Sequence, residues 1–309
     1  MTLTAKGRLA GVIGWPVGHS RSPQLHGHWL ARYRIDGAYV PMAVAPERLE
    51  AALRGLAALG FRGCNVTVPH KEAAMAVVDE LDPLARRIAA VNTIVVREDG
   101  RLFGTNTDGF GFLANLQAGA PNWSAGRGPA VVIGAGGAAR AVIVALVDAG
   151  APEIRLVNRT KSRAETLTAE LGGPITVIDW ADRVAALSGA ALLVNTTTEG
   201  MVGRPALDLA LDALPADALV SDIVYVPLET PLLAAARARG NPVVDGVGML
   251  LHQARPGFEA WFGVAPTVDA ALRAAVLGPV REDPGPHRLD RHGQVHGGGD
   301  VPARRHRRA

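Results

Sequence analysis

Two patterns of apolar and polar positions alternate along the chain. Short runs rich in Val, Ile and Leu are typical of strands, and longer runs with apolar residues at helical spacing separate them. The clearest helical runs cover 46–60, 138–150 and 163–171. The predicted strands are 8–14, 37–44, 64–68, 91–96, 130–135, 154–158, 191–197, 218–225 and 242–245. This alternation predicts an α/β fold with mostly parallel sheets.

The length of the chain and a cluster of Gly and Pro residues predict two domains. A chain of 309 residues exceeds what one hydrophobic core usually serves. Gly and Pro cluster at 119–129 (GAPNWSAGRGP), which indicates a boundary. A helix is also predicted at 71–81 (KEAAMAVVDEL), opened by Lys71.

Composition narrows the class of protein. Hydrophobic residues make up 48% and charged residues 20%, as in an ordinary globular protein. We expect no membrane span, because no long apolar run lacks charges or glycines. We also expect no secretory signal, because the first residues lack a basic and then an apolar region. Cys64 is the only cysteine, which excludes an internal disulfide and favours the cytoplasm.

The net charge of +3 lies entirely in the tail. Residues 281–309 hold seven Arg and four acidic residues, so positions 1–280 balance at 25 basic and 25 acidic residues. We therefore expect no nucleic-acid partner. The tail is rich in Pro, Gly, His and Arg, and we predict that it is disordered and dispensable for turnover.

A glycine-rich turn predicts a dinucleotide site. Residues 130–140 read AVVIGAGGAAR, in which Gly134 permits a tight turn and Gly136 lets the backbone approach a pyrophosphate. Ala139 is small enough for helix-on-strand packing. We assign Ala135, Gly137 and Ala138 to the same loop. A ligand-free turn is the alternative, but the pattern follows a strand and opens a helix.

The next predicted strand favours NADP over NAD. It ends without the acidic residue that would bind the ribose 2′-hydroxyl of NAD. In its place stand Asn158, Arg159 and Thr160, with Arg163 close behind. A guanidinium suits a 2′-phosphate. The alternative is a solvated basic helix start.

The N-terminal half offers polar residues at strand ends and helix starts. Ser20 and Ser22 precede a helical run and would suit a carboxylate, although a helix cap explains them as well. Asn92 begins a strand, and Asp108 precedes a helix, where a cap is its simplest role. Thr67 alone is most simply a strand residue. No His or Cys pair has metal-ligand spacing, so we predict no metal site.

Lys71 is the least expected residue of this half. A cation in the first turn of a helix opposes the helix dipole. Partial burial disfavours a charged lysine and favours one that exchanges protons near neutrality. Asp108 is a candidate partner. On residue type alone, an exposed surface lysine is the simpler interpretation.

Taken together, these motifs resemble the shikimate dehydrogenase family. They run in family order over about the first 265 residues, and the combination is highly specific. The residues that carry the resemblance are GWPVGHSRSPQLH (14–26), NVTVPHKE (65–72), AVNT (90–93), NTDG (106–109), IGAGGAAR (133–140), NRTKSRAE (158–165), NTTTEGM (195–201) and DGVGMLLHQA (245–254).

The resemblance implies an activity, and with it a role in aromatic amino-acid biosynthesis. It implies reversible reduction of 3-dehydroshikimate to shikimate with NADPH, with Lys71 as acid/base and Asp108 as its partner and a substrate ligand. Ser20 and Ser22 would bind the substrate carboxylate. The other implied substrate ligands are Thr67, Asn92, Tyr225 and Gln253. Ile223, Gly246 and Met249 would join the cofactor site near the nicotinamide.

The resemblance also implies an arrangement of domains. A substrate domain would cover 1–112, completed by helices in 250–280, and a Rossmann NADP-binding domain would cover 113–249. Pro256 and Gly257 fall inside the last long helix, so we expect a kink or break there. The oligomeric state is not readable from the sequence; a homodimer is one expectation.

Two alternatives remain open at the level of sequence. The first is a relative that acts on quinate or on both substrates, often with NAD. The second is a catalytically silent NADP-binding sensor, which would have no use for both Lys71 and Asp108.

Overall fold

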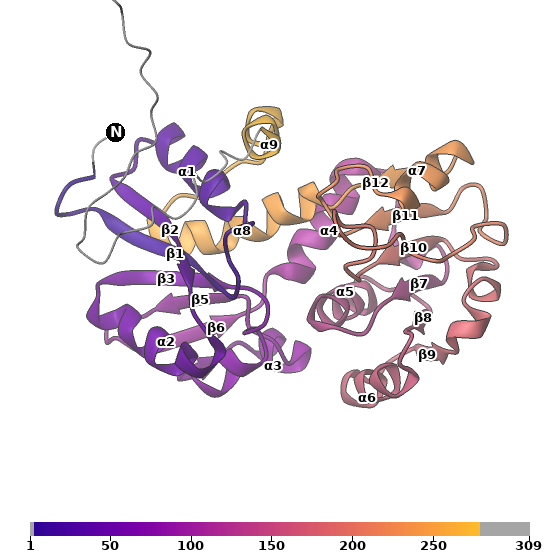
Figure 1. The fold of residues 1–309 in the computed structure, drawn as a ribbon, viewed down its shortest axis with the longest axis horizontal. Coiled ribbons are helices and arrows are strands. Elements are labelled where there is room, and N and C mark those ends of the chain that lie inside the picture. The colour runs from indigo at the N-terminus through magenta and orange to yellow at the C-terminus, as the bar shows by residue number, and fades with distance from the viewer. Residues whose placement is uncertain (1–2, 279–309) are drawn as a thin grey trace, which may run out of the picture. The chain divides into compact units, whose positions relative to one another are not determined.

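The computed structural model describes residues 3–278, whose strands form two six-stranded sheets (Figure 1). The first sheet contains β1 (Arg8–Gly14), β2 (Gly37–Ala43), β3 (Phe61–Val66), β4 (Glu80–Leu81), β5 (Thr93–Val96) and β6 (Leu102–Thr105). The second contains β7 (Ala130–Ile133), β8 (Ile154–Val157), β9 (Ile175–Ile178), β10 (Leu192–Asn195), β11 (Leu219–Asp222) and β12 (Val243–Val244).

The two sheets differ in strand direction. The second is entirely parallel, in the order β12-β11-β10-β7-β8-β9. Its central strands are buried over their whole length, as expected when helices cover both faces. The first has the order β2-β1-β3-β5-β6-β4, and β5 runs antiparallel to β3 and β6. The predicted α/β class with mostly parallel sheets is confirmed. Strands β4, β6 and β9 were not predicted.

Helices connect and cover these strands. The α-helices are α1 (Ser22–Arg32), α2 (Leu49–Ala58), α3 (Pro83–Ile88), α4 (Asp108–Gly119), α5 (Gly137–Asp148), α6 (Lys161–Leu171), α7 (Pro231–Ala238), α8 (Val247–Phe262) and α9 (Ala270–Leu277). Short 3₁₀ helices cover Pro46–Arg48, Ala73–Ala76, Ala125–Arg127, Trp180–Asp182 and Ala185–Leu187. Among these described helices, none has the length and apolarity that a membrane crossing requires.

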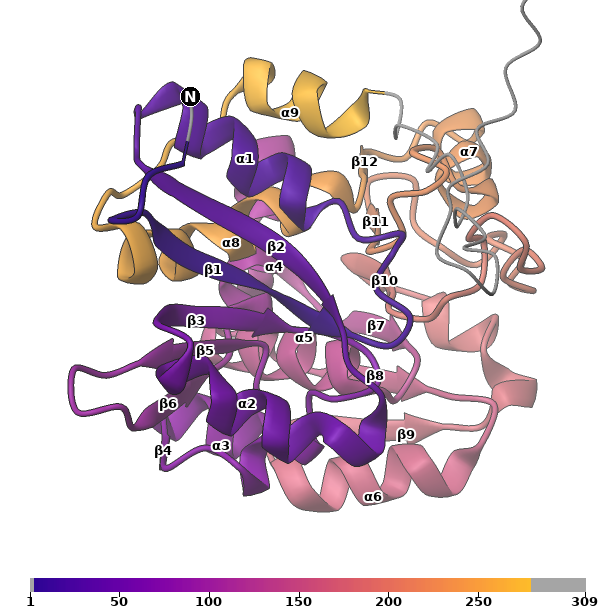
Figure 2. The ribbon, with the colours of Figure 1, turned by 60° about the vertical axis from the view of Figure 1, so that its left-hand side comes forward.

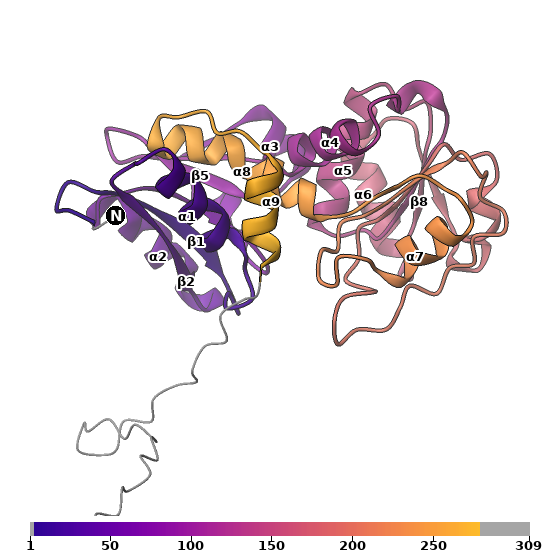
Figure 3. The ribbon, with the colours of Figure 1, turned by 90° about the horizontal axis from the view of Figure 1, so that it is seen from above.

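Helix α8 brings the end of the chain back to the first sheet. It contacts β1, β3 and β5, and it lies on the same side of the sheet as α1 (Figure 2). It also packs along α4, as the view from above shows (Figure 3). Gly111 makes the close approach feasible, since a Cβ there would lie 2.5 Å from the Cβ of Gln253. Residues near 250 therefore reach the polar ends of the first sheet.

The helix predicted at 71–81 is not formed. Only the 3₁₀ turn Ala73–Ala76 is helical, and Lys71 lies in the turn before it. Sheet pairing prevents a longer helix, because the Asp79 N–H donates to Leu102 O and the Asp82 N–H donates to Gly104 O. The dipole conflict expected for Lys71 therefore does not arise.

Pro256 and Gly257 were expected to kink or break the last long helix; the break is wrong, because α8 is continuous from Val247 to Phe262, and the kink stays a prediction. Packing outweighs the one backbone hydrogen bond that a proline removes. Phe258, Trp261 and Phe262 are almost fully buried around this turn. A side chain at Gly257 would come within 2.8 Å of the Trp261 ring. The tail 281–309, predicted to be disordered, lies outside the described residues.

Candidate active site

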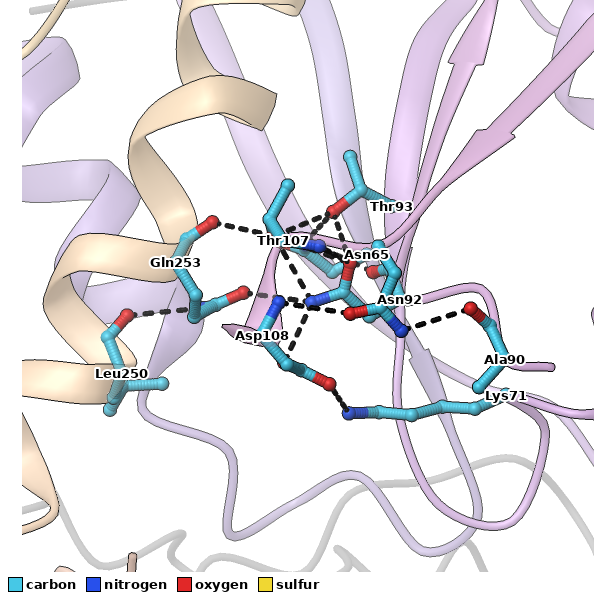
Figure 4. A network of polar contacts seen from close by, with 10 residues as sticks. Asn65, Lys71, Ala90, Asn92, Thr93, Thr107, Asp108, Leu250 and Gln253 are labelled. Atoms are coloured by element: carbon cyan, nitrogen blue, oxygen red, sulfur yellow. Dashed lines mark hydrogen bonds and ion pairs between the residues drawn. The ribbon is translucent and has the colours of Figure 1, made fainter. Parts of the chain in front are cut away.

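Lys71, which follows β3, and Asp108, which follows β6, form an ion pair (Figure 4). Lys71 Nζ donates to Asp108 Oδ2 at 2.5 Å. The lysine side chain is 20% exposed and the aspartate side chain 8% exposed, so Lys71 is not the exposed surface lysine of the simpler interpretation. Its carbonyl accepts from the Val91 N–H at 2.8 Å, which ties the turn to the start of β5. The bond to Asp108 occupies one of the ammonium donors and leaves the others for a ligand.

Asp108 does not act as the helix cap that its position suggested. It is the first residue of α4, and its carboxylate accepts from Lys71 and Asn92 and not from the helix backbone. The local turn is held by Asn106, whose Oδ1 accepts from the Asp108 N–H at 3.0 Å. The other end of that amide donates to Ala90 O at 2.9 Å. The helix start thus delivers a carboxylate to Lys71.

Asn92 and Gln253 belong to the same cluster, as the resemblance implied. Asn92 Nδ2 donates to Asp108 Oδ1 at 2.7 Å and lies 3.4 Å from Gln253 Oε1. Gln253 reaches the cluster from α8, and its carbonyl accepts from Thr107 Oγ1 at 2.8 Å. Asn92, Asp108 and Gln253 are at most 9% exposed. The cluster is therefore a largely dry polar site, in which an unpaired partner would be costly.

Four of the residues expected to bind substrate are not hydrogen-bonded to this cluster in the described part of the chain. Ser22 begins α1, and its N–H donates to Ser20 Oγ at 3.3 Å. Thr67 follows β3, four positions before Lys71. Tyr225 follows β11; burial raises the pKa of its phenol, and the charge of Arg21 acts in the opposite direction.

The glycine turn has two kinds of glycine. Gly134 has φ +110°, and a Cβ there would lie 2.7 Å from Thr196 Oγ1, so the fold itself requires glycine. A Cβ on Gly136 or Gly137 would meet no atom within 4 Å. Open space therefore lies above the first turn of α5, where backbone N–H groups suit a phosphate. Ala139 is fully buried, as its packing role predicted.

The predicted 2′-phosphate residues follow β8 on the surface. Arg159 is 70% exposed and pairs with Glu199 at 3.0 Å. Asn158 Nδ2 donates to Thr160 O at 2.8 Å, which shapes the turn before α6. Arg163 is exposed in the first turn of α6. A cationic surface thus stands beside the glycine turn.

The residues expected near the nicotinamide surround the start of α8. Gly246 is the N-cap, and a Cβ there would lie 2.4 Å from the Ile223 carbonyl. Met249 is only 9% exposed and belongs to the same hydrophobic cluster as Phe112 and Leu116.

Several residues of the site were not singled out in the sequence. Asn65, Thr93 and Thr107 join the cluster around Asn92, and Glu199 pairs with Arg159. All four lie within or beside the quoted motifs. The signal that marks them is a small polar residue, or a single acid, at one end of a short strand or in the loop that follows it.

Known proteins resemble this chain over most of its length. The family model for the shikimate dehydrogenase substrate binding domain matches residues 12–94, and the model for shikimate / quinate 5-dehydrogenase matches 122–204. A shikimate dehydrogenase (NADP(+)) of Paramagnetospirillum magneticum is 66% identical over 275 residues, 89% of this chain and 100% of the relative.

Two solved structures are also similar. The Thermus thermophilus shikimate 5-dehydrogenase in complex with NADP(H) and shikimate is 39% identical, with a TM-score of 0.78 over 87% of this chain and 98% of the other. A quinate dehydrogenase of Corynebacterium glutamicum in complex with NAD is 32% identical, with a TM-score of 0.81 over 88% and 99%.

Proposed function

The chain belongs to the shikimate dehydrogenase family, and we propose on that premise that it reversibly reduces 3-dehydroshikimate to shikimate with NADPH. The observation that carries the proposal is the partly buried Lys71–Asp108 pair within a hydrogen-bonded polar cluster. A cation held in such a place suits a reaction in which negative charge develops on an oxygen.

Lys71 is the acid/base of this proposal. During reduction it gives a proton to the carbonyl oxygen of the substrate, and during oxidation it takes that proton back. The same ammonium stabilises the alkoxide as its charge develops. Asp108 holds Lys71 through Oδ2 and is itself held by Asn92 through Oδ1. It also accepts from a substrate hydroxyl.

The remaining polar residues position the substrate. Ser20 and Ser22, at the start of α1, bind its carboxylate with hydroxyl and backbone N–H groups. Thr67, Asn92, Tyr225 and Gln253 bind its other polar groups. A site built of hydroxyls and amides suits a ring that carries several hydroxyls, because every polar group of the ligand then finds a partner.

NADPH supplies the hydride when it is bound. Residues 134–138 would hold its pyrophosphate, because the space above Gly136 and Gly137 is open. Asn158, Arg159, Thr160 and Arg163 would hold the 2′-phosphate, for which an exposed guanidinium is suited. Ile223, Gly246 and Met249 would lie near the nicotinamide.

Quinate dehydrogenation with NAD is the second candidate, favoured by the fold shared with the quinate enzyme of Corynebacterium glutamicum. Arg159 speaks against NAD, because a guanidinium offers no advantage for an unphosphorylated ribose. A silent sensor is disfavoured by the Lys71–Asp108 pair, since binding alone needs no proton transfer.

Initial rates with four substrate pairs test the proposal. Shikimate and quinate are each offered with NADP and with NAD, and the reduced cofactor is followed by absorbance. We expect fast turnover only with shikimate and NADP. Comparable rates with quinate or NAD would identify the broader-specificity enzyme, and tight NADP binding without turnover would identify the sensor.

We also propose the domain division 1–112 and 113–249, with the first domain completed by residues from 250 onward. Helix α4 crosses the division between the two domains, and α8 packs along α4. Both support a helical connection between the domains. The cytoplasmic location rests on the single cysteine and on the NADPH chemistry. The homodimer stays a prediction, which size-exclusion chromatography with light scattering would test.

A further inference from the structure

A chain of hydrogen bonds leads from the first sheet to Asp108. Tyr39 OH donates to Asn65 Oδ1 at 2.6 Å, and Asn65 Nδ2 donates to Thr93 Oγ1 at 3.1 Å. Thr93 Oγ1 donates to Asn92 Oδ1 at 2.9 Å, and Asn92 Nδ2 donates to Asp108 Oδ1 at 2.7 Å. Figure 4 shows its last members beside Lys71. Only Asn92, Asp108 and Lys71 have roles in the proposed reaction.

Backbone groups fix the orientation of both amides in this chain. The Thr107 N–H, which can only donate, points at Asn92 Oδ1 at 2.9 Å, so Asn92 Nδ2 must face Asp108. The Asn92 carbonyl, which can only accept, takes a bond from Asn65 Nδ2 at 3.2 Å. Asn65 must therefore present its N–H groups to Thr93. With that donor on its oxygen, the Thr93 hydroxyl has two acceptors in reach, Asn92 Oδ1 at 2.9 Å and Thr107 Oγ1 at 3.3 Å, and the shorter distance favours Asn92.

The members of the chain have no alternative partners in water. Asn65 is 6% exposed and Thr93 is 1% exposed. The phenol of Tyr39 is also buried, and burial raises its pKa well above the usual range, so the phenol stays a donor. A fully satisfied buried network holds its members in one arrangement. Loss of the Thr93 link would remove one donor from Asn92 Oδ1, so that Thr107 alone would hold the amide against Asp108.

We infer that Thr93 and Asn65 are positioning residues that act on Lys71 through Asn92 and Asp108. This inference rests on the proposed function of the pair. By holding the Asn92 amide, Thr93 and Asn65 keep Asp108 Oδ1 occupied, so that Oδ2 is directed at Lys71. Neither residue contacts Lys71 or needs to touch the substrate.

A matched set of threonine variants tests the inference. Thr93→Val removes the hydroxyl and keeps the shape, whereas Thr93→Ser keeps the hydroxyl. Thr105→Val is the control, because Thr105 lies directly opposite Thr93 on β6 and its hydroxyl donates to Asp82 at 2.6 Å. Each protein is assayed for kcat, for KM with shikimate and NADP, for the pH profile of kcat, and for its melting temperature.

We expect Thr93→Val to lower kcat about tenfold, equivalent to about 1.4 kcal/mol of barrier, with the KM for NADP unchanged. Its pH profile should shift, and Thr93→Ser and Thr105→Val should behave like the wild type. A wild-type kcat and pH profile in Thr93→Val would overturn the inference, and so would a serine variant that fails to restore them.

A second variant covers the case in which Thr93→Val does not fold. Tyr39→Phe removes the first donor of the chain, together with the contact of the same hydroxyl with Ser22, and should lower kcat by about two- to fivefold, with the same shift of the pH profile. An unchanged profile there would equally overturn the inference. Failure of the proposed function is distinguishable, because the wild type itself would then not oxidise shikimate with NADP.

Discussion

Around Asp108 the polar side chains satisfy one another, whereas around the glycine turn they face open space. Asn65, Asn92 and Thr93 are at most 6% exposed and all hydrogen-bonded within the protein. Arg159 is 70% exposed, and a Cβ on Gly136 would meet no atom within 4 Å. The first region is organised before any ligand arrives; the second offers donors that a ligand would complete. Catalysis benefits from polar groups that are already held in place. Binding of a large charged cofactor benefits from donors that remain accessible.

Among the substitutions around Asp108 and the glycine turn, Asp108→Asn should reduce turnover the most. The variant keeps the shape, but it removes the charge that faces Lys71 and places an amide opposite the Asn92 amide. We expect kcat for shikimate oxidation to fall by about 10²–10⁴-fold. Asp148→Asn is the control, because Asp148 forms an exposed ion pair with Arg87 at 2.7 Å. A kcat within a few-fold of the wild type would contradict the role of Asp108.

Arg159→Ala should affect the second region alone. A hydrogen bond to a charged group contributes about 1.5–3 kcal/mol, so we expect KM for NADP to rise about 10–100-fold. Rates with NAD should not change, since NAD lacks the 2′-phosphate. Lys161→Ala is the matched control; that exposed cation begins α6 and pairs with Asp179. Equal losses with both cofactors would show that Arg159 does not recognise the phosphate.

Two alanine variants should separate the glycines of the turn. Gly134→Ala places a Cβ on a residue with φ +110° and against Thr196, so we expect the free energy of unfolding to fall by about 1–3 kcal/mol. Gly136→Ala meets no protein atom, so its melting temperature should stay unchanged. Its methyl group fills the space above α5, and NADP should bind about tenfold more weakly. Calorimetry supplies both quantities, and an unaltered affinity in Gly136→Ala would count against the pyrophosphate site.

The pH dependence of stability at His26 tests, with a smaller expected effect, whether water is excluded from the region around Asn65. It stacks on Tyr39 with ring centroids 3.9 Å apart, and burial lowers its pKa from 6.5 to about 3, although Asn65 acts in the opposite direction. The unfolded chain therefore binds a proton that the folded chain excludes between about pH 6.5 and 3. Stability from this residue is complete above pH 6.5 and falls by about 1.4 kcal/mol per pH unit as the pH drops.

Urea unfolding at pH 7, 6 and 5 measures that slope. His26→Leu should lose this part of the pH dependence, while His292→Leu, outside the described residues, should retain it. Identical slopes in the wild type and His26→Leu would mean that water or a partner reaches the imidazole.

Every strand predicted from the sequence is present, although several end two or three residues before the predicted end, because turn-forming residues mark a loop better than they mark the last strand residue. The pairing of strands into sheets was harder to predict from the sequence. The helix expected at Lys71 is replaced by a short turn because Asp79 and Asp82 pair with β6, a strand that was not predicted. Helix α8 likewise tolerates Pro256 because of aromatic packing from other elements.

The hydrogen-bond chain could not be predicted from the sequence for the same reason. Tyr39, Asn65 and Thr93 are far apart along the chain and meet only when β2, β3 and β5 assemble. Each alone looks like an ordinary strand residue. Their joint role depends on distances and on which backbone groups can only donate or only accept.

The most direct test of the account is kcat for shikimate oxidation by Lys71→Ala, measured beside Lys161→Ala and with NADP affinity from calorimetry. Loss of the acid/base and of its charge should lower kcat by about 10³-fold or more, whereas NADP affinity should remain that of the wild type. A variant that binds NADP and turns over within tenfold of the wild type would contradict the central claim that Lys71 carries the proton.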